Sequence, residues 1–188
     1  MTLFMVIGNS GAGKTSLMRE VAGIEHEIVS VTTRRMRAGE EQGVGHYFIS
    51  EREYNNLYSA GQFVAYSMYA GESYGVTKDE LTSKLSTGFA YAVVDHTGYK
   101  QLKRYCFNNR IHAISILLYN SKLEAESIMR DRGDAQFRIE RRLVTHAVEV
   151  ETGRAHHDFV IYNPYGRAEM TKQILRAIIN GYTGRVEP

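Results

Sequence analysis

Short apolar runs, separated by polar and turn-forming segments, predict the strands of this chain. Five such runs occupy residues 3–7, 28–31, 91–94, 114–118 and 159–161. The runs that end at Val94 and Leu118 show no polar alternation, which is typical of strands buried on both faces of a parallel sheet. Residues 47–49 and 62–69 predict shorter strands in an insert between the second and third core strands.

Capping motifs predict where several helices begin. The pattern Ser/Thr-x-x-Glu occurs at Ser50–Glu53, Thr77–Glu80 and Ser121–Glu124. In this motif the hydroxyl and the carboxylate each accept a bond from a backbone N–H that the helix leaves free. Gly61 and Gly88 follow where the first two helices are expected to stop. From Ser121 to about Val150 the chain is polar and rich in arginine, which predicts a mobile helical cover.

Residues 8–15 read G-x-x-x-x-G-K-[ST], directly after the first apolar run. In such a loop the glycines let backbone N–H groups converge on phosphate oxygens, while the lysine reaches the outer phosphates. The following segment, Thr15 to Val21, predicts a helix whose N-terminal dipole faces the same anion. The motif predicts a nucleoside triphosphate site with Lys14 catalytic and Thr15 as the Mg²⁺ ligand. The residues assigned to this site are Asn9, Ser10, Gly11, Ala12, Gly13, Lys14, Thr15 and Ser16.

Strands that alternate with helices around this loop predict an α/β fold: a doubly wound parallel sheet of the P-loop NTPase type. A second basic motif follows, with Arg34 and Arg37 three residues apart. Two arginines at this spacing can grip one phosphate from a turn. On its own, the pair would favour a solvated basic loop; beside the phosphate loop, it predicts a second anion site.

Composition and charge limit the class of protein. The 188 residues suffice for one well-buried core, and the apolar and charged fractions, 43% and 23%, are ordinary. A net charge of +2 gives no argument for nucleic acid or an anionic membrane as partner. Cys106 is the single cysteine, so an internal disulfide is excluded. No apolar run approaches the roughly 20 residues of a membrane helix, and we expect a cytoplasmic protein.

Taken together, these motifs resemble the guanylate kinase family. The family carries a phosphate loop, then Ser-x-x-Thr-Thr-Arg-x-x-Arg-x-Gly-Glu, a Tyr-Gly strand, a core strand bearing Asp, and an Arg-Gly lid followed by Arg-Leu. The matching residues are Thr32-Thr33-Arg34, Arg37 with Gly39-Glu40, Tyr74-Gly75, Asp95 with Gly98, Arg132-Gly133, Arg142-Leu143 and Val160-Ile161-x-Asn163. The match covers roughly residues 3 to 180, and the combination is far more specific than any one motif.

The resemblance implies a single guanylate-kinase-like domain over residues 1–188, in three parts. These are a core of residues 1–31, 88–120 and 154–188, an insert of residues 32–87 that binds a nucleoside monophosphate (NMP), and a helical lid of residues 121–153. It also implies Mg²⁺-dependent transfer of the ATP γ-phosphate to a nucleoside monophosphate. The first acceptors expected are GMP and dGMP. The expected assembly is a monomer or a homodimer.

The resemblance assigns roles to individual residues. The catalytic set is Lys14, Arg34, Arg132 and Arg142. The acceptor set is Ser30, Arg34, Arg37, His46, Tyr47, Tyr74 and Asp95. An ungapped alignment places His46 where the family has a phosphate-binding tyrosine, whereas a slip of one residue places Tyr47 there. Asn163 is expected in the turn near the base of ATP.

Some positions depart from the family pattern. Ala65 stands where the family has a glutamate that accepts from guanine N1 and N2, and Val76 where a hydroxyl donates to O6. A site built to hydrogen-bond a base loses orders of magnitude in selectivity when those partners vanish. Tyr119 and Asn120 also replace the usual Pro-Pro.

Three alternatives to a GMP kinase therefore stay open. The first is a kinase for another or a modified (deoxy)nucleotide, and the second is a ribose 1,5-bisphosphate phosphokinase. The third is a guanylate-kinase-like module that binds protein and has lost catalysis. ATP turnover separates the enzymes from the binding module.

Overall fold

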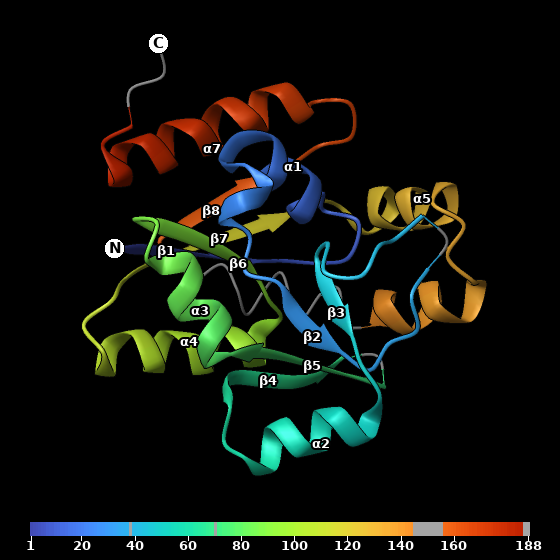
Figure 1. The fold of residues 1–188 in the computed structure, drawn as a ribbon. Helices are drawn as coiled ribbons and strands as arrows, with labels where there is room; N and C mark the ends of the chain where they lie inside the picture. Colours follow the sequence, from blue (N-terminus) through green and yellow to red (C-terminus); the bar gives the residue numbers. More distant parts are fainter. Residues whose placement is uncertain (38, 70, 145–155, 186–188) are drawn as a thin grey trace.

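Strand β1 (Thr2–Ile7) lies inside a four-stranded parallel sheet with the order β6-β1-β7-β8. The other strands are β6 (Phe89–Val93), β7 (His112–Tyr119) and β8 (Phe159–Tyr162). The computed structural model describes residues 1–37, 39–69, 71–144 and 156–185. The predicted α/β class with a parallel core sheet is confirmed (Figure 1).

Both faces of this sheet are buried, which explains the apolar runs without polar alternation. Alternate residues of β1 point to opposite faces. Leu3 and Met5 join a cluster with α3 (Lys78–Leu85) and α4 (His96–Asn108). Phe4 and Val6 join a second cluster with α1 (Lys14–Ala22) and α7 (Ala168–Thr183). The two helix layers are visible on either side of the core sheet in Figure 1.

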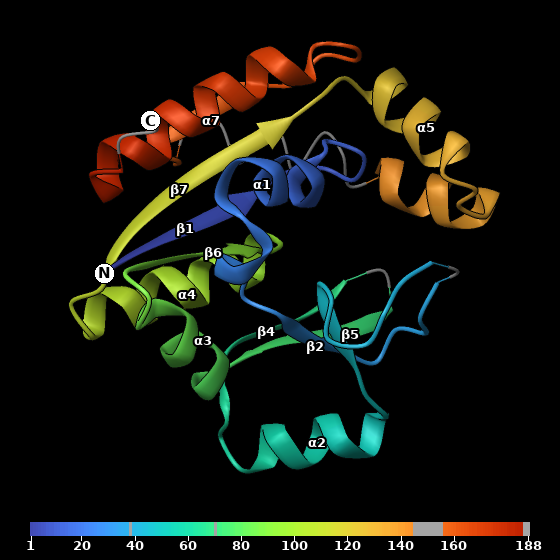
Figure 2. The ribbon, with the colours of Figure 1, turned by 45° about the horizontal axis from the view of Figure 1, so that its top comes forward.

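A second sheet, with the order β3-β2-β5-β4, lies in the region of the predicted insert. Its strands are β2 (Ser30–Thr32), β3 (His46–Phe48), β4 (Phe63–Tyr69) and β5 (Glu72–Thr77). Strands β4 and β5 form an antiparallel pair, and β2 runs parallel to β3. Helix α2 (Glu51–Ser59) covers the side of this sheet away from the core, as Figure 2 shows.

The structure corrects the prediction that residues 28–31 form a core strand. The N–H of Ile28 donates to the carbonyl of Tyr91 in β6 at 2.9 Å, as part of an isolated bridge between Glu27 and Tyr91. This bridge does not extend into a strand pairing. The chain then enters the insert sheet as β2. Polar side chains fix it there, because the Thr32 hydroxyl donates to the carbonyl of Ser73 at 2.9 Å.

Two of the three capping boxes, at Ser50 and Ser121, are confirmed. At the third, the Thr77 hydroxyl accepts from the N–H of Glu80 as predicted, at 3.3 Å. The Glu80 carboxylate, however, accepts from the N–H of Val29 at 2.9 Å. This glutamate thus ties α3 to the segment that leads into β2.

The predicted lid contains α5 (Lys122–Asp131), and its residues 136–144 are also helical. Residues 145–153 of the predicted lid, and residues 38, 70, 154–155 and 186–188 of the other predicted parts, lie outside the described residues. A short 3-10 helix, η1 (Ile24–His26), follows α1. Within the described ranges, none of the helices combines the length and the apolar character needed to cross a membrane.

The insert is attached to the core through α4. The Gln101 side chain pairs with the backbone of edge strand β4, accepting from the N–H of Tyr66 at 2.9 Å and donating to its carbonyl at 2.8 Å. Val64 and Val76 of the insert share an apolar cluster with Leu102 of α4. Helix α4 therefore links the insert to the core sheet.

Candidate active site

The carboxyl ends of β1, β6 and β7 meet at one edge of the core sheet. The chain leaves β1 for β6 on one side and later returns as β7 on the other, which places the switch in strand order at β1. Ligands of open α/β sheets bind at such a point. Gly8, Asp95 and Asn120 follow the three strands there, and Gly8 and Asp95 line a cavity of about 400 Å³.

The loop after β1 has the backbone shape that the motif predicts. Gly8, Gly11 and Gly13 have φ angles of 142°, 81° and 80°, a region that disfavours residues with a Cβ. A Cβ on Gly8 would also overlap the carbonyl oxygen of Leu118. The loop therefore packs against the end of β7, and the helix α1 begins directly after it at Lys14.

Asparagine side chains hold this loop from behind. The Asn9 amide donates to Oδ1 of Asn120 at 2.5 Å, and the Asn120 amide donates to the carbonyl of Gly11 at 3.1 Å. Asn163 donates to the carbonyl of Ala12 at 3.1 Å and accepts from the Thr171 hydroxyl at 2.8 Å. The structure thus places Asn9, Ala12 and Asn163 behind the loop, away from the side chains that line the cavity.

The remaining loop residues line the cavity directly: Ser10, Gly11, Gly13, Lys14, Thr15 and Ser16. Nζ of Lys14 donates to the carbonyls of Gly8 and Asn9, at 2.6 Å and 2.9 Å, so the lysine folds over its own loop. The Thr15 hydroxyl and the Asp95 carboxylate line the same cavity, and oxygen donors of this kind suit Mg²⁺. The residues present therefore fit a nucleotide phosphate chain with its metal ion.

Arg34 approaches from the insert. Its two terminal nitrogens donate to the two oxygens of Glu40, at 2.9 Å and 2.8 Å. Burial alone would raise the pKa of Glu40, but bonds from Arg34 and from the N–H of Arg37 hold this pKa at about 2. The carboxylate therefore stays ionised and fixes the guanidinium, which lines the cavity.

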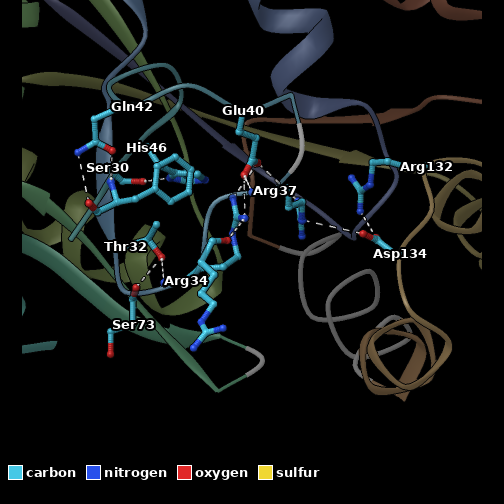
Figure 3. Close-up of polar contacts among 12 residues, drawn as sticks. Ser30, Thr32, Arg34, Arg37, Glu40, Gln42, His46, Ser73, Arg132 and Asp134 are labelled. Atoms are coloured by element: carbon cyan, nitrogen blue, oxygen red, sulfur yellow. Dashed lines mark hydrogen bonds and ion pairs between the residues drawn. The ribbon is translucent and has the colours of Figure 1, made fainter. Parts of the chain in front are cut away.

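Three further arginines meet on a carboxylate of the lid. Arg132 donates to Asp134, and Arg142 donates to the same carboxylate at 3.1 Å. Arg37 of the insert forms an ion pair with it at 4.0 Å. Figure 3 shows Arg34 and Arg37 beside Glu40, and Arg132 beside Asp134. All four arginines line the cavity that contains Lys14.

The structure distinguishes the two candidates for the phosphate-binding tyrosine position. His46 lines the cavity, and its Nδ1 lies 2.8 Å from the hydroxyl of Ser30, another predicted acceptor residue. Tyr47 is not among the residues that line the cavity and is 40% exposed. Burial, followed by the nearby charge of Arg34, lowers the pKa of His46 to about 4. The imidazole is therefore neutral at physiological pH.

Tyr74 and Asp95 complete the predicted acceptor set, and both line the cavity. The ring of Tyr74 lies 5.7 Å from the ring of His46, centroid to centroid. Asp95 caps α4, since its Oδ1 accepts from the N–H of Gly98 at 2.7 Å.

His156 and His157, which adjoin Asp158, belong to no metal-binding cluster of three ligand residues within the described part of the chain.

Comparison with known proteins gives the family. The guanylate kinase family model matches residues 1–180. The chain belongs to the guanylate kinase family. It is 33% identical to the guanylate kinase of Synechococcus sp. (strain JA-3-3Ab), covering 94% of this chain and 81% of that protein. It is also 33% identical to the guanylate kinase of Methylobacillus flagellatus, covering 98% and 91%.

A solved structure supports the fold. The crystal structure of guanylate kinase from Anaplasma phagocytophilum superposes with a TM-score of 0.71, covering 99% of this chain and 87% of that one. The two sequences are 24% identical. The predicted family and fold are thereby confirmed, and the homologous guanylate kinases are nucleoside monophosphate kinases.

Within this guanylate kinase fold, the two departures in the base pocket lie side by side. Ala65 and Val76 are cross-strand partners on β4 and β5. They are 2% and 3% exposed, and both line the cavity. Neither side chain can donate or accept a hydrogen bond. This part of the pocket therefore presents an apolar wall to the molecule that would accept the phosphate.

Two residues of the site escaped the sequence reasoning. In the sequence Asn120 is only a departure from Pro-Pro, because its bonds to the phosphate loop join positions far apart along the chain. One local feature points to Asp134: it is an acidic residue that directly follows the Arg132-Gly133 pair. Its partners Arg37 and Arg142 become neighbours only through the tertiary fold.

Proposed function

We propose that this protein is an ATP-dependent kinase that transfers the γ-phosphate of ATP to a nucleoside monophosphate, with GMP or dGMP as the first acceptors. The observation that carries the proposal is one cavity lined by Lys14 of the phosphate loop and by Arg34 of the insert. Phosphoryl transfer needs two anionic reactants aligned, their charge neutralised and water excluded. The predicted division into a core, an insert of residues 32–87 and a lid of residues 121–153 suits this need.

Each side of the cavity has its own task. The N–H groups of the phosphate loop and Lys14 bind the triphosphate, and Thr15 would hold Mg²⁺, which neutralises phosphate charge when bound. Arg34, Arg37, His46 and Tyr74, with Ser30 and Asp95 beside them in the cavity, bind the acceptor phosphate and sugar. Arg132 and Arg142 bring positive charge from the lid to the transferring group. In this scheme the protein supplies orientation and charge, and no side chain forms a covalent intermediate.

The rival reading as a protein-binding module is disfavoured by the same geometry. Such a module has no need for the ATP-binding half of the cavity, yet Lys14 and Thr15 are present and the loop glycines keep their positive φ angles. Ribose 1,5-bisphosphate remains an alternative acceptor, and the apolar wall at Ala65 and Val76 favours testing it.

One chain supplies every residue of this scheme, so a monomer and a homodimer both satisfy it. The buried, unpaired thiol of Cys106 suits the cytoplasm.

A coupled assay of ATP consumption tests the proposal. All ribo- and deoxynucleoside monophosphates, together with ribose 1,5-bisphosphate, are offered in turn to the wild-type protein and to Lys14→Ala. We expect turnover of GMP or dGMP in the wild type and a loss of about 10²- to 10³-fold in Lys14→Ala. Lys78→Ala, an exposed lysine of the insert, is the matched control and should keep wild-type activity. Absence of turnover with every acceptor would overturn the assignment.

A further inference from the structure

The carboxylate of Asp134 lies where arginines from different segments of the chain converge. Arg132, two residues before it, and Arg142, from the helical segment after it, both donate to Oδ2. Arg37 reaches Oδ1 from the insert, with Nε at 4.0 Å. Figure 3 shows Arg37 and Arg132 both directed toward this side chain. Asp134 thus connects the lid to the insert.

The electrostatics of this cluster require an anion. The Asp134 side chain is only 5% exposed. Burial opposes its ionisation, but the bond from Arg132 and the charges of Arg142 and Arg37 lower its pKa below the ordinary value. The pKa of Arg37 is lowered by burial and by repulsion from Arg34, Arg142 and Arg132, and Asp134 acts against that shift. The carboxylate therefore offsets the repulsion that would drive these cations apart.

Asp134 lies beside the cavity that contains Lys14. Arg37, Arg132 and Arg142 line this 400 Å³ cavity, and Asp134 lines the neighbouring cavity of about 950 Å³, which shares Arg37 and Arg132 with it. Glu40 also lines the neighbouring cavity, and its partner Arg34 lines both. Asp134 thus pairs with arginines that face Lys14, as Glu40 pairs with Arg34.

We propose that Asp134 is a positioning residue for phosphoryl transfer. Resting on the proposed function, this inference adds that one buried carboxylate sets the arginines of lid and insert at the place where the phosphate is transferred. The arginines then need no reorganisation when lid and insert close on the reactants. Misplacement by about 1 Å of groups that orient a reaction can cost about 10²-fold in rate.

Asp134→Asn tests the inference, because it keeps the shape of the side chain and removes its charge. We expect kcat to fall about 10²-fold, with the KM values for ATP and acceptor changing much less. Activity is expressed per folded protein, with the folded fraction measured by circular dichroism at the assay temperature. Asp134→Glu, which restores the charge, should recover part of kcat. The matched control is Glu126→Gln, which removes a lid carboxylate paired with Arg130 at 2.7 Å on the exposed face of α5.

A double-mutant cycle shows whether Asp134 acts through the arginines. In an Arg132→Ala background, Asp134→Asn should lower kcat by much less than it does in the wild type, because the group that it positions is absent. Fully additive losses, or an equal loss in Glu126→Gln, would overturn the inference. A rise in activity on Asp134→Asn would also overturn it, by showing a carboxylate that competes with phosphate. If the wild type turns over and Asp134→Asn has the same kcat, this inference alone is overturned. If the wild type shows no activity, the proposed function is overturned as well.

Discussion

The side chains of Asn9 and Asn120 bond to each other across the junction between the phosphate loop and the end of β7. The Asn9 amide donates to Oδ1 of Asn120 at 2.5 Å, and the backbone N–H of Asn120 donates to Oδ1 of Asn9 at 3.2 Å. Both residues are 1% exposed. This pair fixes the loop at a position where the family usually has Pro-Pro, and the Asn120 amide reaches Gly11 as well.

Asn120→Ala should destabilise the protein and weaken ATP binding. The substitution leaves the buried amide of Asn9 and the carbonyl of Gly11 without these partners, at a cost of about 1–3 kcal/mol. Chemical denaturation measures the free energy of unfolding, and initial rates measure the KM for ATP. Asn108→Ala, at the exposed end of α4, is the control and should change stability by less than about 0.5 kcal/mol. Equal stability of the two variants would contradict the role assigned to the pair.

Arg34→Lys should raise the KM for the acceptor. Lysine keeps the charge but loses the planar fork that meets both oxygens of Glu40, so the cation is no longer fixed toward the cavity. We expect an increase of about tenfold, equivalent to about 1.4 kcal/mol, with a smaller change in the KM for ATP. Arg35→Lys, the exposed neighbour, serves as control and should behave as wild type. An unchanged acceptor KM in Arg34→Lys would remove Arg34 from the acceptor site.

Ala65→Glu combined with Val76→Thr should increase the preference for GMP over AMP. The two positions are cross-strand partners that line the cavity, so the new acceptor and donor would act on the same base. We expect the ratio of kcat/KM for GMP to that for AMP to rise at least roughly tenfold. Ala65→Gln with Val76→Thr has nearly the same volume without the charge, and should gain less. If the ratio does not move, the base does not bind against this wall.

Stability should fall as the pH drops from about 6.5 toward 4. Burial, before any other cause, lowers the pKa values of His46 and His157 from 6.5 to about 4. The unfolded chain therefore binds protons in this window while the folded chain does not, so acid favours unfolding. Above pH 6.5 both states are neutral at these positions and the contribution is complete.

His157→Phe checks this explanation. Both ring nitrogens of His157 are buried without a hydrogen-bond partner among the described residues, and the ring packs on Tyr99 with centroids 4.6 Å apart. Phenylalanine keeps the packing and does not titrate. The variant should lose less unfolding free energy than the wild type between about pH 7 and about pH 5. Denaturant melts at the two pH values measure the difference, and an equal loss in both proteins would assign the dependence to other groups.

Features whose interacting residues are close along the chain could be predicted from the sequence. The helix starts at Ser50 and Ser121 need only a hydroxyl and a glutamate three residues later, and both form as predicted. The phosphate loop likewise carries its glycines and Lys14 within one short segment. The buried core strands followed from continuous apolar runs. Local hydrogen bonds depend on near neighbours, and a strand buried on both faces needs apolar residues along its whole length, so both leave a pattern in the sequence.

Features that join distant segments became apparent only in the folded chain. Residues 28–31 are apolar enough for a core strand, yet β2 pairs within the insert, because the side chains of Ser30 and Thr32 find polar partners there. The alignment left His46 and Tyr47 open, and the fold directs His46 to the cavity. The ion pair between Asp134 and Arg37 of the insert likewise forms only in the folded chain. Burial and charge pairing of this kind arise from the packing of whole elements, which the sequence pattern does not record.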